Sequence, residues 1–143
     1  MGAKPLTPGD LQSITEKTQL AKVQEQFERV KREDQERKAL HEAFMTRYLP
    51  PEVMELINTA VRRAAEQGAH ELQMLRFPAS YCNDHGRRIN NAEPDWPESL
   101  EGFAKRALEF FEAELKPLGF RARAQILNYP NGKLGDVGLF LSW

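Results

Sequence analysis

Cysteine is almost absent from this sequence. Cys82 is the only one among 143 residues, so no disulfide can form within the chain and no site with several cysteine ligands can hold a metal. The net charge is only −1, which gives the whole molecule no attraction to nucleic acid or to an anionic membrane. We therefore predict no disulfide framework, no bound metal and no cofactor.

Long apolar runs are also missing. No stretch approaches the roughly 20 apolar residues that a membrane-spanning helix needs, and the segment from Met1 to Pro8 lacks the apolar region of a signal peptide. Leu6 stands where a myristoylation signal requires Ser or Thr. We expect a cytoplasmic protein that does not associate with a membrane.

Proline and glycine are absent between Asp10 and Arg47, which predicts one long helix. Thr7 is a good capping residue, Pro8 suits the first helical position, and Asp10 favours the positive end of the helix dipole. Four acids each precede a base by four residues, a spacing typical of a solvated helix: Glu25/Arg29, Glu28/Arg32, Glu33/Arg37 and Asp34/Lys38. We divide the chain into an extended charged helix, residues 1–48, and a small α+β domain, residues 49–143.

An apolar stripe runs along this helix. It consists of Leu20, Val23, Phe27 and Val30, which follow the 3-4-3 spacing of a coiled-coil seam for two heptads before polar residues interrupt it. The stripe either packs on the chain's own domain or is covered by another molecule. Residues 31–38 are charged on every face, so that part of the helix should project into water. We therefore favour an interface with a second copy or a protein partner.

The double proline after Leu49 ends the helix, and the apolar spacing beyond it predicts the order α-β-α-β-β. The expected elements are a helix over 52–67, a strand over 70–77, a helix over 98–116, and strands over 120–129 and 136–143. The last strand is the most apolar and should lie in the sheet centre. The second helix should bury Val53, Leu56, Ile57, Ala60, Val61 and Ala64.

These elements predict an α+β fold with a three-stranded sheet and two helices packed on one face. The other face should expose Arg121, Arg123, Gly138, Phe140 and Ser142. Arginine beside an aromatic residue suits single-stranded nucleic acid, but the charge balance and the lack of an RNP motif argue against that use. Nucleic acid is therefore not an expected partner.

The segment from 78 to 97 is long and polar for a connection, which is typical of a binding loop. Arg87 and Arg88 have the guanidinium groups that hold phosphate or carboxylate. The candidate ligand-binding residues are Asp84, His85, Arg87, Arg88, Asn90, Asn91 and Trp96. Structural interpretations stay open for each: solvated arginines, asparagines that bond the loop's own backbone, and a tryptophan that packs the loop on the core.

Catalytic interpretations of this loop rest only on the close spacing of a few residues, which is weak evidence. Cys82 and His85 form a possible thiolate–imidazolium pair, and with Asp84 a possible metal site, but a second pair of ligands is missing. Asp95 or Ser99 is expected to cap the helix that follows. We assign no catalytic residue and do not predict an enzyme.

Two segments of the C-terminal half resemble small bacterial proteins known as hypothetical open reading frames. They read GRxINNAEPxWP from Gly86 and GDVGxxLxW from Gly135. The resemblance implies a bacterial source and an α+β domain, and it brings no activity, cofactor or catalytic residue. The sequence therefore predicts an oligomeric or partner-binding protein; the alternative is a domain that binds a small molecule or anion, or an enzyme, through residues 81–96.

Overall fold

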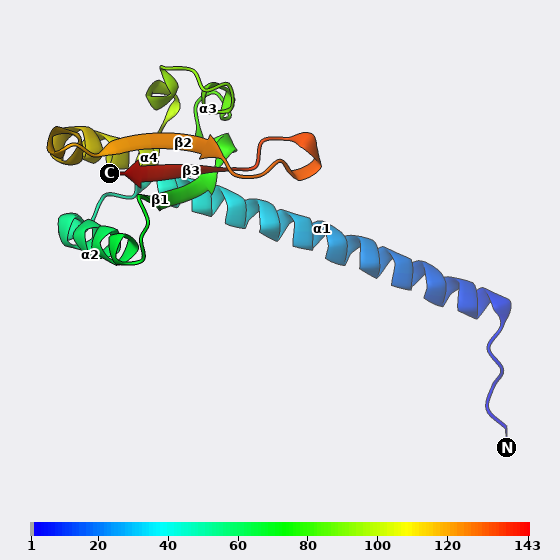
Figure 1. The fold of residues 1–143 in the computed structure, drawn as a ribbon. Coiled ribbons are helices and arrows are strands. Elements are labelled where there is room, and N and C mark those ends of the chain that lie inside the picture. Colours follow the sequence, from blue (N-terminus) through cyan, green and yellow to red (C-terminus); the bar gives the residue numbers. More distant parts are fainter. Residues whose placement is uncertain (1) are drawn as a thin grey trace. The chain divides into compact units, whose positions relative to one another are not determined.

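The computed structural model describes residues 2–143 and has an α+β fold (Figure 1). The chain divides into two compact units, one that ends at Glu42 and one that runs from Ala43 to Trp143. In the part of the chain that the structure describes, no helix is both long and apolar enough to cross a bilayer.

Helix α1, Pro8–Thr46, confirms the predicted long helix. The Thr7 side-chain oxygen accepts a hydrogen bond from the Asp10 amide, and the Asp10 carboxylate accepts one from the Thr7 amide, each at 3.1 Å. The hydrogen bond from the Thr7 amide, and after it one from the Thr7 side chain, lowers the pKa of the Asp10 carboxyl group. The helix start is therefore fixed by a reciprocal cap. Further along, Arg37 forms its ion pair with Asp34 rather than with the predicted Glu33.

The sheet has three strands: β1 (Glu71–Pro78), β2 (Arg121–Ile126) and β3 (Asp136–Ser142). β3 lies between the other two and is antiparallel to both (Figure 1), which confirms the central position predicted for the last strand. One face of the sheet is apolar in all three strands because aligned residues share a face. Its members are Leu72, Leu75, Phe77, Ala122, Ala124, Ile126, Val137, Leu139 and Leu141.

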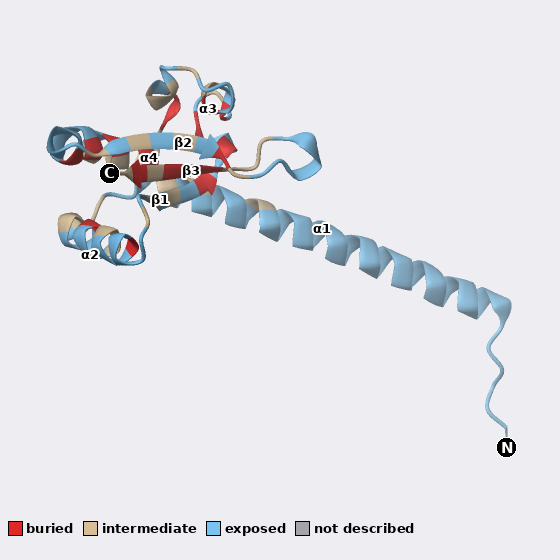
Figure 2. Ribbon diagram, viewed as in Figure 1, coloured by how far each residue is buried: buried red, intermediate tan, exposed pale blue. Residues whose placement is uncertain are grey.

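Helices α2 (Val53–Glu66) and α4 (Gly102–Phe110) lie over this apolar face, as predicted. Figure 2 shows the burial concentrated in β3 and in the elements around it.

Two details of the prediction for these helices are wrong. Leu56 of α2 is 55 % exposed, and α4 begins at Gly102, four residues later than expected, because residues 96–99 form a separate 3-10 turn. α4 also changes hydrogen-bonding pattern, into a π-helical turn at Phe111–Leu115 and a 3-10 turn at Lys116–Leu118.

The other face of the sheet corrects the prediction for Gly138, which is buried. A Cβ atom there would lie 2.8 Å from the Phe140 ring and 2.9 Å from Leu127, so these two side chains cover it. The Arg123 guanidinium lies 4.1 Å from the Phe140 ring centre and donates two 2.6 Å hydrogen bonds to Glu71. Those bonds lower the pKa of Glu71. The arginine and the aromatic ring are therefore already engaged with groups of the same sheet.

The last turn of α1 belongs to the compact unit that begins at Ala43. The Phe44 ring packs 5.3 Å from Phe77, 4.8 Å from Tyr81 and 6.3 Å from Phe103, measured between ring centres. Three elements, β1, α4 and the segment after β1, thus meet at one aromatic side chain. Burial of aromatic rings in such clusters is a large stabilising contribution in a small domain.

Arg106 of α4 secures the same helix end. Its Nη1 atom donates 2.9 Å hydrogen bonds to the carbonyl oxygens of Met45 and Arg47. The carbonyls at a helix C-terminus lack partners within the helix, and a guanidinium satisfies them and complements the dipole. The end of α1 is therefore held by a charged cap from an element about sixty residues away in sequence.

We predict that replacing Gly102 by alanine destabilises the protein more than replacing Gly132 does. Both glycines have positive φ, +58° and +76°, so alanine carries a backbone cost of about 1–2 kcal/mol at either position. Only at Gly102 does the new Cβ also collide with backbone, 2.8 Å from Met45 Cα and 2.9 Å from Phe44 O, which adds about 1–3 kcal/mol. Urea unfolding measures both losses, and equal losses would contradict the close approach.

Candidate functional site

The segment between β1 and α4, predicted as one long loop over 78–97, contains short helical elements. It contains 3-10 turns at Ala79–Tyr81 and Trp96–Ser99 and the short helix α3, Arg87–Asn90. Asp84 organises the start of α3, because its two carboxylate oxygens accept hydrogen bonds from the amides of Gly86 (2.9 Å) and Arg88 (3.0 Å). The carboxylate has a structural role here as a local cap.

Both candidate arginines contact carboxylates of the same segment. Arg87 lies 3.3 Å from Glu93, and Arg88 lies 3.4 Å from Asp95 and 3.9 Å from Asp84. The Arg88 side chain is the less exposed of the two. An anion that binds either guanidinium must therefore compete with an acid that is already there, which lowers the gain from binding.

The structure brings some of the candidate ligand-binding residues together and leaves the others apart. A polar hollow brings four of them together, Asp84, His85, Arg87 and Asn90, with Lys133 from the turn before β3. We define the polar hollow by its lining: Ser80, Asp84, His85, Arg87, Asn90, Gly132, Lys133 and Leu134. Arg88, Asn91 and Trp96 are not part of that lining.

Asn90 and Trp96 differ in how well they were predicted. The Asn90 side chain does not bond its own loop; its Oδ1 atom accepts a 2.9 Å hydrogen bond from the Tyr129 hydroxyl, which joins α3 to the end of the β2 segment. Trp96 packs against the core, as its structural interpretation expected. The predicted helix caps are wrong: Asp95 pairs with Arg88, and the Ser99 hydroxyl donates to the Trp96 carbonyl at 2.7 Å.

Cys82 is buried in this segment, and its thiol is held in the neutral form. Burial raises its pKa from 9.0 to about 11, the Asp84 charge adds to the rise, and a hydrogen bond with Ser99 opposes it. A thiol with that pKa supplies almost no thiolate at neutral pH, so it is a poor nucleophile.

Within residues 2–143, no group of three His, Cys, Asp or Glu side chains is arranged to hold a metal.

The raised pKa of Cys82 predicts an alkaline loss of stability. Below pH 9 the thiol is neutral in both states; between pH 9 and 11 only the unfolded chain loses the proton, so unfolding becomes easier. We expect this one group to remove on the order of 2 kcal/mol over that range. Urea unfolding from pH 8 to 11 measures it, and Cys82→Ala should show a correspondingly smaller decline. Parallel declines in the two proteins would contradict burial of the thiol.

The apolar stripe of α1 is exposed along its whole length. The exposed fractions are 60 % for Leu20, 63 % for Val23, 72 % for Phe27 and 47 % for Val30. Among the residues that the structure describes, α1 contributes none that is buried, and Figure 2 shows it exposed over most of its length.

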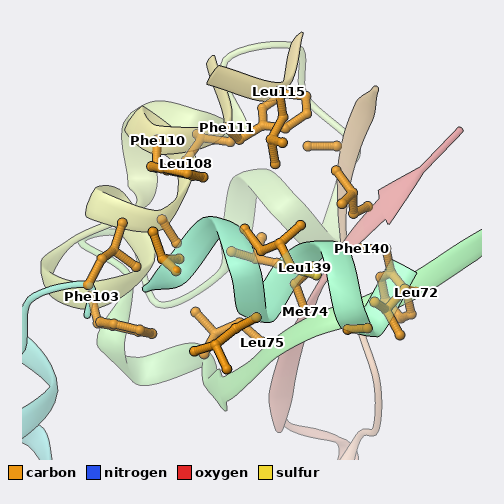
Figure 3. Close-up of a pocket in the computed structure, with 18 of the residues that line it drawn as sticks. Leu72, Met74, Leu75, Phe103, Leu108, Phe110, Phe111, Leu115, Leu139 and Phe140 are labelled. Atoms are coloured by element: carbon orange, nitrogen blue, oxygen red, sulfur yellow. The ribbon is translucent and has the colours of Figure 1, made fainter. Parts of the chain in front are cut away.

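An apolar cavity of about 380 Å³ lies between α2, α4 and the sheet, and sequence reasoning did not foresee it. Figure 3 shows the labelled lining side chains from β1, β3, α4 and the π-helical turn. The residues that line it are Arg47, Leu49, Pro50, Val53, Leu56, Ile57, Ala60, Leu72, Gln73, Met74, Leu75, Phe103, Ala107, Leu108, Phe110, Phe111, Leu115, Ala122, Leu139, Phe140 and Leu141.

Two backbone irregularities border this apolar cavity. The π-helical turn Phe111–Leu115 supplies lining residues from α4's side, and a register shift between Gln73 and Leu75 places the extra residue Met74 on β1's side. The one sequence signal for the cavity is the adjacent pair Phe110 and Phe111. Neighbouring residues of a regular helix point about 100° apart, so two adjacent large apolar residues widen the apolar face of the helix. Both of these side chains line the cavity.

No protein-family model, curated protein or solved structure matches this chain. The function must therefore be inferred from the three features above: the apolar stripe, the polar hollow and the apolar cavity.

Proposed function

We propose that this chain is a cytoplasmic interaction protein that pairs with a second copy of itself through the apolar stripe of α1. The observation that carries the proposal is the exposure of Phe27 and Val30, together with Leu20 and Val23, on a helix with no buried residue among those the structure describes. Most helical stability in proteins comes from covering an amphipathic face. A helix of 39 residues that covers none of its own apolar stripe gains that stability from another molecule.

Charge at the edge of the stripe favours a second copy in parallel orientation. If Leu20 and Phe27 occupy one seam position and Val23 and Val30 the other, Glu33 and Lys38 occupy the two flanking positions. In a parallel pair the flanking residue of one helix faces the other helix's flanking residue five positions later. Glu33 of each copy therefore faces Lys38 of the other, while Asp34 and Arg37 each face their own counterpart, a repulsion that the ion pair between Asp34 and Arg37 within each helix offsets.

The length of the stripe limits the strength of this pairing. The seam positions that follow Val30 are Asp34 and Arg37, which form an ion pair with each other on the same helix. Two heptads of apolar contact must offset the loss of translational and rotational freedom on association. We therefore expect a weak dimer whose population depends on concentration in the micromolar range.

Sedimentation equilibrium of the full chain between about 5 and 200 µM tests the pairing. The wild-type protein should shift from monomer to dimer over that range, and Phe27→Glu should remain monomeric because it places a charge in the seam. Leu11→Glu is the matched control: Leu11 is an exposed apolar residue of α1, and its position is about 180° around the helix from Leu20.

Two results would contradict the proposal. The first is a wild-type protein that stays monomeric at the highest concentration. The second is a dimer that Phe27→Glu and Leu11→Glu weaken equally, since the stripe would then have no special role.

The second candidate function is the binding of a phosphate or carboxylate in the polar hollow. The observation that favours it is the convergence of His85 and Arg87 with Lys133, three basic side chains from two separate segments. It ranks second because Asp84 lines the same hollow and Glu93 already neutralises Arg87.

Thermal denaturation with inorganic phosphate tests this candidate. Phosphate at ten times its dissociation constant should stabilise the wild-type chain by about 1.4 kcal/mol, and Lys133→Ala and Arg87→Ala should each reduce that gain. Lys105→Ala, an exposed lysine of α4 outside the lining, is the control for the loss of one charge. Equal stabilisation of all four proteins would show nonspecific salt stabilisation and remove the candidate.

A further inference from the structure

We propose that the apolar cavity binds a small anionic amphiphile, a medium-chain carboxylate whose tail enters between α2, α4 and the sheet and whose head group meets Arg47. The cavity volume of about 380 Å³ lies in the range of small-molecule sites, which are mostly apolar with a few placed polar groups. It is small for a peptide segment. The site shares no residue with the apolar stripe, so the two proposals can fail separately.

The lining determines the chemistry of the tail. Of the described residues around the cavity, nearly all are aliphatic or aromatic, and none is acidic. The least exposed of them are Leu115 and Leu141, each 3 % exposed. Apart from Arg47 and Gln73, this surface has no side-chain donor or acceptor, so a polar group placed among the apolar side chains would lose its hydrogen bonds to water without compensation.

Arg47 determines the chemistry of the head group, because it is the one charged side chain in the described lining. Its guanidinium lies 4.3 Å from the Phe103 ring centre, and Phe103 also lines the cavity. Its own carbonyl is held by Arg106, so the backbone that carries it is fixed. A guanidinium stacked on an aromatic ring still presents its edge for two hydrogen bonds to a carboxylate.

The mouth of the cavity carries exposed apolar side chains. Leu56 is 55 % exposed and Met74 is 38 % exposed, and both line the cavity. A bound tail would cover them, and each buried methylene contributes roughly 0.8 kcal/mol. This explains why α2 carries a leucine at a position that the structure leaves open to water.

The two backbone irregularities support a site rather than a packing defect. π-helical turns and β-bulges each interrupt a regular hydrogen-bond ladder, and both occur frequently beside functional sites. Here the turn at Phe111–Leu115 and the bulge at Met74 border the same space from opposite elements. Regular backbone at either place would turn different side chains toward the cavity.

Isothermal titration calorimetry of the full chain with octanoate, octanol and octylammonium tests the inference. Octanoate should bind saturably at one site, about tenfold more tightly than octanol because of the ion pair with Arg47, and octylammonium should not bind. Arg47→Gln should reduce octanoate to the affinity of octanol. Arg62→Gln, a charge loss at an exposed position of α2 outside the described lining, should leave the preference intact.

Two variants test the location. Ala60→Phe fills the cavity from α2 and should weaken octanoate and octanol alike. Leu56→Glu places an acid at the exposed mouth, where it disturbs little of the core, and should weaken octanoate more than octanol. This second variant keeps the test decisive if the first one does not fold.

Several outcomes would overturn the proposal. Octanoate binding that does not saturate, or that both location variants leave unchanged, would place no ligand in the cavity. Equal affinities for octanoate and octanol in the wild-type chain would remove the anionic head group. Octanoate that dissociates a dimer would show that an apolar side chain of a second copy occupies the cavity instead.

Discussion

The contact between the last turn of α1 and the first turn of α4 is the constraint on which most of this domain depends. Gly102 lets the two backbones approach more closely than any side chain would permit. Phe44 then reaches Phe103 and the ring of Phe77 on β1, and Arg106 caps the carbonyls of the helix end. One crossing thus joins the first helix, the sheet and the last helix, and it sets Arg47 beside the apolar cavity.

The segment between β1 and α4 follows a different physical logic, in which charges are satisfied locally. Asp84 bonds two amides of its own turn, and Arg87 and Arg88 pair with acids a few residues away. Such exposed ion pairs contribute little to stability individually, but they leave the arginines less free for a ligand. A long polar segment rich in charge can therefore be either a binding loop or a folded connection. Its composition alone does not distinguish these two cases.

The sequence predicted the features that arise from neighbouring residues. Alternation in β2 and β3, the proline-free run of α1 and its Thr7 cap are local patterns, and the structure confirms them. The start of α4 was missed because residues 96–99 form a separate 3-10 turn, and the helix begins only at Gly102, which lies against the backbone of Phe44 and Met45 nearly sixty residues earlier. The cap predicted at Ser99 failed for a local reason, since its hydroxyl donates to the Trp96 carbonyl within the 3-10 turn that precedes the helix. Contacts at such separations leave no periodic trace in a single sequence.

The apolar cavity was missed for a related physical reason. Apolar residues at helical and alternating spacing predict a packed core, and the predicted buried face of α2 included Leu56 on that basis. This space is bordered by two departures from regular backbone geometry, at Met74 and in the turn at Phe111–Leu115, which hydrophobic spacing does not reveal. The same apolar pattern is therefore compatible with a filled interior and with a binding cavity. Arg47 is the side chain at which the two cases differ: its guanidinium stacks on Phe103 in both, and in a binding cavity a bound anion would give it a second partner.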